Sequence, residues 1–164
     1  MMEEFLFSLS AFAALLPSAF VALKRRQAGR GDEGRDATFW LTLAVAVAGP
    51  LVWVIVKMSG AWQTGLSTTL WVTIAASMMI FAVLTVLNDK AWRLTPLLIP
   101  YMAVLAVFAI VWQQAPVARP LMDKPGGWIE AHILVSVATY ALVTIAAVAA
   151  LAAFLQERAL KTKH

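Results

Sequence analysis

The sequence contains no cysteine, and this absence excludes several kinds of protein at once. A disulfide-stabilised scaffold, a thiolate metal centre and an iron–sulfur cluster all need cysteine side chains. The chain also lacks the HExxH and GxSxG patterns, a phosphate-binding glycine loop and a paired carboxylate site. No catalytic constellation is present, so the sequence favours a binding or assembly protein over an enzyme.

Charged residues are scarce as well. They make up only 13% of the chain, whereas apolar residues make up 62% and the mean hydropathy is +0.79. Soluble domains have roughly 45–50% apolar and about 25% charged residues. The apolar residues occur in separate runs close to the ~20 residues that a helix needs to cross ~30 Å of hydrocarbon. We therefore predict an integral membrane protein that consists of a single membrane domain, residues 1–164.

The apolar runs predict an all-α, polytopic bundle of transmembrane helices. A β-barrel is disfavoured because its strands would be ~10 residues long and would alternate in polarity. Gly49-Pro50 predicts a kink in the second run, whereas Pro96 and Pro100 fall in the opening turns of the fourth, where proline is tolerated. The five predicted spans are Phe5–Leu23, Ala37–Val56, Ser67–Leu87, Leu94–Trp112 and Ala131–Leu155.

Basic residues are distributed unevenly between the two sides of the predicted bundle. Because loops rich in lysine and arginine stay in the cytoplasm, the N-terminus is predicted outside and the C-terminus in the cytoplasm, across a bacterial inner membrane. This topology explains the net charge of +4 better than nucleic-acid binding does, and we expect the bilayer but no nucleic acid as a partner. One side carries Lys24, Arg25, Arg26, Arg30, Arg35, Lys90, Arg93, Arg158, Lys161 and Lys163, and the other carries Lys57, Arg119 and Lys124.

Tryptophan is concentrated on the predicted outer side. Two interpretations remain open: an aromatic belt at the membrane–water interface, or a flat apolar platform for a planar ligand. Trp53, Trp62, Trp71, Trp112 and Trp128 map to the outer side, and Trp40 and Trp92 map to the cytoplasmic side.

Two stripes of polar residues recur at four-residue steps inside the spans. They predict either helix–helix packing through hydroxyl hydrogen bonds or a polar-lined cavity between the third and fifth spans. All acidic residues fall outside the cores of the spans, which disfavours an ion- or proton-driven transporter. The stripes are Thr69, Thr73, Ser77 and Thr85 in the third span and His132, Ser136, Tyr140 and Thr144 in the fifth.

His132 is the candidate site residue, because it lies just inside the fifth span at the predicted outer boundary. A neutral imidazole there can ligate a metal or heme iron, or it can act as an interfacial hydrogen-bonding group. One ligand does not make a site, and His164 is expected as a cytoplasmic tail residue. The loop from Gln113 to Glu130 is predicted to be irregular, with Asp123 and Glu130 as solvated charges.

The run WIEAHILVSVATYALVTIAAVAALAAFLQERALK resembles the start of the core region of the cytochrome c assembly family, the CcsA, CcmC and YpjD-like membrane proteins that handle heme. The four preceding spans are similar to the N-terminal part of the YpjD-like branch in number and loop charge. The matching residues are Trp128, His132-Ile133, Ser136, Tyr140, the alanine-rich run and Gln156-Glu157-Arg158.

The resemblance implies that His132 is one of two outward-facing axial ligands of a heme cofactor. It implies a role in heme handling or delivery during cytochrome c biogenesis, with apocytochrome c or other membrane subunits as partners. The sequence departs from the family pattern, because it ends at His164 before the tryptophan-rich WWD segment and the second external histidine. We expect either a fragment of a longer protein or a shortened relative, and the alternative function is an accessory structural subunit without its own heme site.

Overall fold

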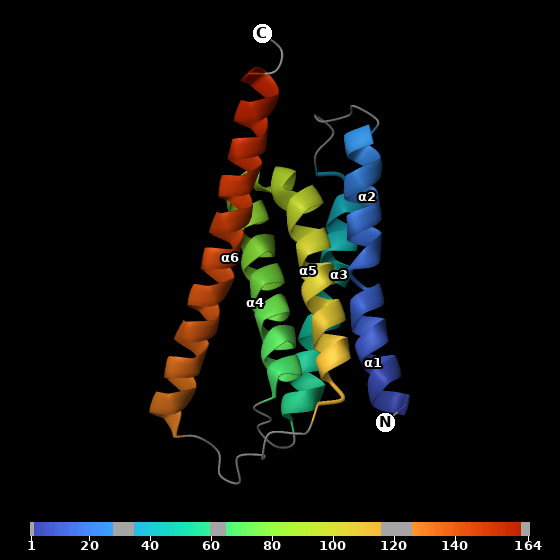
Figure 1. Ribbon diagram of the computed structural model, residues 1–164, viewed down its shortest axis with the longest axis vertical. Coiled ribbons are helices and arrows are strands. Elements are labelled where there is room, and N and C mark those ends of the chain that lie inside the picture. The colour runs from blue at the N-terminus through green and yellow to red at the C-terminus, as the bar shows by residue number, and fades with distance from the viewer. Residues whose placement is uncertain (1, 28–34, 60–64, 116–125, 162–164) are drawn as a thin grey trace.

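The computed structural model describes residues 2–27, 35–59, 65–115 and 126–161, and over these residues the secondary structure is helical, with no strands. The all-α prediction is confirmed, as are five segments long and apolar enough to cross a membrane. The helices are α1 (Met2–Ala13), α2 (Leu16–Gln27), α3 (Ala37–Met58), α4 (Leu66–Leu87), the 3-10 helix η1 (Ala91–Leu94), α5 (Thr95–Trp112) and α6 (Gly127–Lys161) (Figure 1).

The first predicted span, Phe5–Leu23, falls within the apolar segment Met2–Lys24, which consists of two short helices. Ala14 and Leu15 form a turn between α1 and α2, and the Leu15 amide donates to the Phe12 carbonyl, three residues back, at 3.0 Å. Pro17 follows directly; its ring lacks an amide donor and crowds the carbonyl four residues earlier. The helix therefore stops before the proline and restarts around it.

The α1–α2 break is the point where α3 comes closest to the first span. A Cβ atom built on Gly49 would lie 2.4 Å from the Ala14 Cβ and 3.3 Å from the Ala11 carbonyl oxygen. Only a residue without a side chain permits this approach. Helix α3 continues through Gly49-Pro50 without a break, and Pro50 is buried within it.

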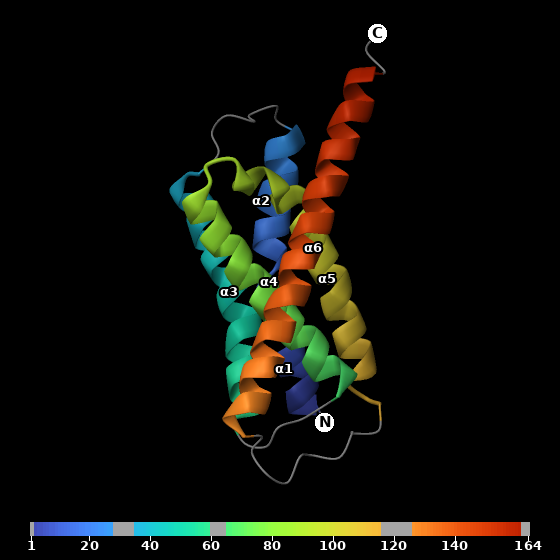
Figure 2. The same ribbon diagram turned by 90° about the vertical axis from the view of Figure 1, so that its left-hand side faces the viewer.

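Helix α4 lies in the middle of the bundle. Helices α3, α5 and α6 pack against it, while α1 and α2 pack against α3 and α5 (Figures 1 and 2). Its buried residues recur at the three- and four-residue steps of one helical face and its flanks. They are Thr68, Trp71, Ile74, Ala75, Ser77, Met78, Phe81 and Thr85.

The two ends of the bundle differ in composition. The tryptophan end is where α1, α4 and α6 begin and α3 and α5 end, and it carries Trp53, Trp71, Trp112 and Trp128. The basic end is where α2, α4 and α6 end and α3 and η1 begin, and it carries Lys24, Arg35, Lys90, Arg93, Arg158 and Lys161. Helix α1 begins at the tryptophan end and α6 ends at the basic end, so the first and last helices start and finish at opposite ends of the bundle (Figure 1).

Arg35 fastens α3 to the end of α4 at the basic end. Its guanidinium donates to the Thr85 carbonyl at 3.1 Å and forms an ion pair with Asp89. Thr85 lies in the last turn of α4, whose carbonyls have no partner within the helix. The next residue, Asp36, caps α3 by accepting a hydrogen bond from the Phe39 amide at 2.9 Å.

Helix α6 is longer than a single crossing requires. Its 35 residues extend for about 52 Å at ~1.5 Å per residue, against ~30 Å of hydrocarbon. It begins at Gly127, so Trp128 and Glu130 are helical and the prediction of irregular structure up to Glu130 is wrong. The Gly126 carbonyl accepts from the amides of Ile129 and Glu130 and so closes the first turn; residues 116–125 of that loop lie outside the described residues.

Replacing Gly49 with alanine tests the close contact between α3 and the α1–α2 break. Overpacking costs about 1–3 kcal/mol, whereas alanine gains up to about 1 kcal/mol in helix propensity, so we expect a net loss of about 1–2 kcal/mol. Reversible unfolding in detergent and SDS mixtures measures it.

Gly65→Ala is the matched control, because a Cβ at Gly65 would meet no atom within 4 Å. Adding Ala14→Gly to Gly49→Ala removes the nearer clash and should recover part of the loss. Equal stability of Gly49→Ala and the unmodified protein would contradict the close packing.

Candidate functional site: His132 and the tryptophan end

His132 lies in the second turn of α6, at the tryptophan end of the bundle and opposite the end that carries Arg35. Its side chain is exposed, and within the described residues its imidazole has no hydrogen-bonding partner or ion pair. Its backbone carbonyl accepts a hydrogen bond from the Ser136 hydroxyl at 2.8 Å. Both ring nitrogens of His132 are therefore available to an incoming group.

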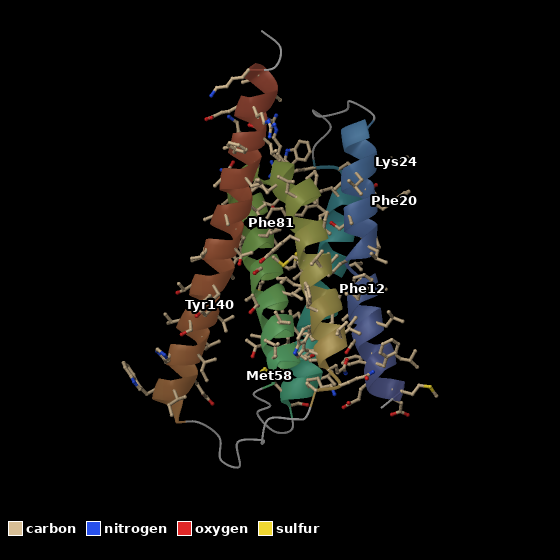
Figure 3. The ribbon with its side chains drawn as sticks, in the orientation of Figure 1. Phe12, Phe20, Lys24, Met58, Phe81 and Tyr140 are labelled. Carbon is tan, nitrogen blue, oxygen red and sulfur yellow. The ribbon has the colours of Figure 1, made fainter. Side chains whose placement is uncertain are left out.

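The register of α6 explains why His132 faces outward. The helix buries Ala141, Ile145 and Val148 against its neighbours, and none of residues 127–140 is buried. His132 precedes Ala141 by nine residues, which at about 100° per residue places it on the opposite side of the helix. Tyr140, labelled in Figure 3, is 67% exposed.

The polar stripe of α6 winds around the helix and does not form one face. A four-residue step advances about 40° on an α-helix, so the stripe drifts from the outward side at His132 toward the packed side at Thr144. Thr144 is accordingly half-buried, next to the buried Ile145. His132, Ser136, Tyr140 and Thr144 therefore do not together line a cavity against α4, because His132 and Tyr140 are exposed.

Three hydroxyl groups of α4 bond within their own helix, whereas the buried Ser77 hydroxyl has no partner among the described residues. Thr69 donates to the Gly65 carbonyl at 3.1 Å, Thr73 to the Thr69 carbonyl at 2.9 Å, and Thr85 to the Phe81 carbonyl at 2.8 Å. Such back-bonding satisfies the hydroxyl without linking two helices. These three hydroxyls neither join α4 to α6 nor offer donors to a ligand.

Trp128 is the aromatic neighbour of His132. It lies one helical turn earlier on α6 and is 87% exposed. Four residues apart, the two side chains occupy the same side of the helix. The tryptophan end thus presents an indole and an imidazole side by side on an uncovered helix surface.

The other tryptophans at this end divide into two groups. Trp53 and Trp71 are buried and stack on each other with ring centroids 5.2 Å apart, so they form neither an interfacial belt nor a platform for a ligand. Trp112 is 46% exposed. Trp62 lies outside the described residues, as do Asp123 and His164.

The buried tryptophan pair was missed by the sequence analysis. Trp53 donates its indole N–H to the Ser8 hydroxyl at 2.9 Å, which links α3 to α1. The available signal is the three- to four-residue spacing that connects Trp53 to the buried Pro50 and Ala46. That spacing places Trp53 on the packed face of α3.

The described residues do not place a set of metal ligands around His132. No group of three or more His, Cys, Asp or Glu side chains in that part of the chain could hold a metal ion. Glu130 lies two residues from His132 on the helix, where side chains do not face each other. What the site offers is one exposed imidazole with an aromatic neighbour.

No family model matches the chain, and no solved structure matches it. It is 51% identical, over all 164 residues, to a protein of Azospirillum brasilense named as an uncharacterized 28.8 kDa protein in the nifR3-like 5′ region. The chain spans 60% of the length of that relative. The aligned region includes every helix described above, and the relative's name states no ligand or activity.

Removal of the Ser8 hydroxyl tests the link between α1 and α3. Ser8→Ala leaves the buried Trp53 N–H without an acceptor, so we expect a loss of about 1–2 kcal/mol in unfolding free energy. Ser10→Ala is the control, because the exposed Ser10 hydroxyl bonds to the Phe7 carbonyl of its own helix. Equal effects of the two substitutions in detergent unfolding would refute the role of Ser8.

Proposed function

We propose that this protein is a multi-span membrane protein of the cytochrome c assembly type, which binds and positions heme at the tryptophan end. His132 acts as one axial ligand of the heme iron. The observation that carries the proposal is the exposed imidazole, without a partner among the described residues, on a side of α6 that no described helix covers. The protein binds and presents the cofactor and performs no bond-making step with its own side chains.

The residues at this site fit one face of a heme. Axial ligation needs an imidazole nitrogen that can approach the iron, and a porphyrin needs apolar aromatic surface beside it. His132 supplies the first and Trp128 the second, whereas Trp53 and Trp71 are committed to the core. The second axial ligand comes from residues outside those described, either in a longer polypeptide or in a partner.

The outward side of α6 supports an arrangement in which further protein completes the site. Tyr140 lies near the middle of this long helix, and its hydroxyl has no hydrogen bond among the described residues. A polar group facing hydrocarbon without a partner costs several kcal/mol, on the order of 2–7. A neighbouring helix with a hydrogen-bonding side chain removes this cost, and the A. brasilense relative has the additional length for one.

Charge asymmetry supports an orientation with the tryptophan end outside. At the basic end the structure places Lys24, Arg35, Lys90, Arg93, Arg158 and Lys161. At the tryptophan end Lys57 is the basic side chain among the described residues, and it forms an ion pair with Glu4. The positive-inside rule then places the basic end in the cytoplasm of a bacterium and His132 at the outer face of its inner membrane, where apocytochrome c is the client.

An accessory structural subunit is the second candidate function. The α4 hydroxyls that bond within their helix and the poorly covered first turns of α6 are also consistent with a protein that docks onto a larger membrane complex. In that role His132 holds no heme.

Heme binding separates the two functions. We expect the purified chain in nanodiscs to bind added hemin with the spectrum of a high-spin heme that has one histidine ligand, and added imidazole to convert it to the low-spin form. His132→Ala should weaken hemin binding at least tenfold, because the one axial ligand available in the described residues is lost.

His164→Ala is the matched control, because it removes the other histidine of the chain and should leave the spectrum unchanged. Equal hemin spectra for His132→Ala and the unmodified chain would favour the accessory subunit.

Thiol labelling tests the orientation without background, because the chain has no native cysteine. Gln114 lies at the tryptophan end and Gln156 toward the basic end, and both side chains are exposed. In intact cells, a membrane-impermeant maleimide should label Gln114→Cys and should label Gln156→Cys only after lysis. The reverse pattern would contradict the proposed topology and place His132 on the cytoplasmic side.

A further inference from the structure

Three buried polar atoms at the tryptophan end have no hydrogen-bonding partner among the described residues: the Trp71 indole Nε1, the Ser67 hydroxyl oxygen and the Gln113 amide oxygen. Trp71 is fully buried. An unsatisfied buried donor or acceptor costs about 1–3 kcal/mol, so native structures leave few of them. Three such atoms at one end of the bundle indicate a bound polar group there, while two others, the Ser18 and Ser77 hydroxyl oxygens, lie elsewhere on α2 and α4.

Comparison with Trp53 shows that the Trp71 indole N–H lacks a hydrogen-bond acceptor in the described part of the chain. The two indoles stack on each other in the same part of the core. The Trp53 N–H has its acceptor in the Ser8 hydroxyl, whereas the Trp71 N–H has none among the described side chains. Its missing partner is a hydrogen-bond acceptor small enough to fit beside a fully buried ring.

Spacing along α4 favours a bridging molecule. Ser67 precedes Trp71 by one turn, and side chains four residues apart lie about 5–6 Å from each other at their Cβ atoms. Two hydrogen bonds of about 2.8–3.0 Å through one water molecule cover such a distance. A direct bond between the two side chains is not formed in the structure.

Gln113 supplies an acceptor at the same end. It follows α5, which packs against α4, and its amide N–H group donates to the Glu4 carbonyl at 3.3 Å. That bond fixes the direction of the amide and leaves the Oε1 atom without a donor. The three groups together offer one N–H donor, one hydroxyl and one carbonyl oxygen, which suits a water molecule with about three hydrogen bonds.

We infer that an ordered water molecule occupies the interior of the tryptophan end. It accepts a hydrogen bond from the Trp71 N–H and donates to the Ser67 hydroxyl and to the Gln113 amide oxygen. The water joins α4 to the end of α5, in the way that the Ser8 hydroxyl joins α1 to α3. The site is independent of the proposed heme ligand, because it involves neither His132 nor α6.

Nitrogen-15 NMR of the indole N–H groups tests this site in the intact chain in nanodiscs. The Trp71 and Trp53 resonances are assigned with Trp71→Phe and Trp53→Phe. We expect a Trp71 indole proton shifted downfield as in a hydrogen bond, with a cross-peak to water, whereas the Trp53 indole proton shows the downfield shift without the water cross-peak.

Substitutions then identify the partners of the water. Ser67→Ala and Gln113→Leu should each weaken the water cross-peak at least twofold and move the Trp71 indole proton upfield, while Ser8→Ala should move the Trp53 resonance alone. A cross-peak that is lost in Ser67→Ala and retained in full in Gln113→Leu would arise from the hydroxyl itself and would overturn the bridging water.

The unmodified protein provides a test that does not depend on the stability of any variant. A Trp71 indole proton at the position of a free indole, with no water cross-peak, would overturn the inference by itself.

Discussion

Burial of one face of α4 is the constraint on which the rest of the bundle depends. Trp71, Ile74, Met78 and Phe81 are completely buried, and α3, α5 and α6 pack around them. Because almost every surface of these helices is apolar, polarity alone cannot distinguish inside from outside, and shape decides which faces meet. Gly49 illustrates how closely the helices fit, because one added carbon atom there would collide with the turn between α1 and α2.

Polar groups in the bundle fall into two classes, and the difference bears on function. Most hydroxyls bond to a carbonyl of their own helix, and the Trp53 N–H bonds to the Ser8 hydroxyl. The hydrogen-bonding capacity of these groups is therefore satisfied within the bundle. Other groups remain without a partner among the described residues, among them His132, Tyr140 and Trp71. The first two lie on α6 and support a site that further protein and a cofactor complete, and Trp71 supports a buried water.

Sequence reasoning placed the helical segments well because each is a continuous apolar run bounded by charged or turn residues. It missed the break at Ala14 because Pro17 was passed over inside an apolar run. It also extended the irregular loop before α6 too far, to Glu130, because glycine and proline favour irregular structure. In the structure the Gly126 carbonyl closes the first turn of α6, and the helix begins at Gly127. Trp53 and Trp71 were assigned to the interface from their position near the helix ends, and only the packing of neighbours shows that they are core.

The sequence by itself determined that this chain is all-helical, that five segments are long and apolar enough to cross a membrane, and that the indole-rich and basic residues lie at opposite ends. Length, hydropathy and the position of charges are local properties, so they can be determined from the sequence without knowledge of the tertiary structure. Tertiary structure decided which tryptophans are buried, that His132 faces away from the bundle, and that Gly49 lies against the first span. Those facts depend on which face of each helix meets its neighbour, and in an apolar chain steric fit alone fixes that.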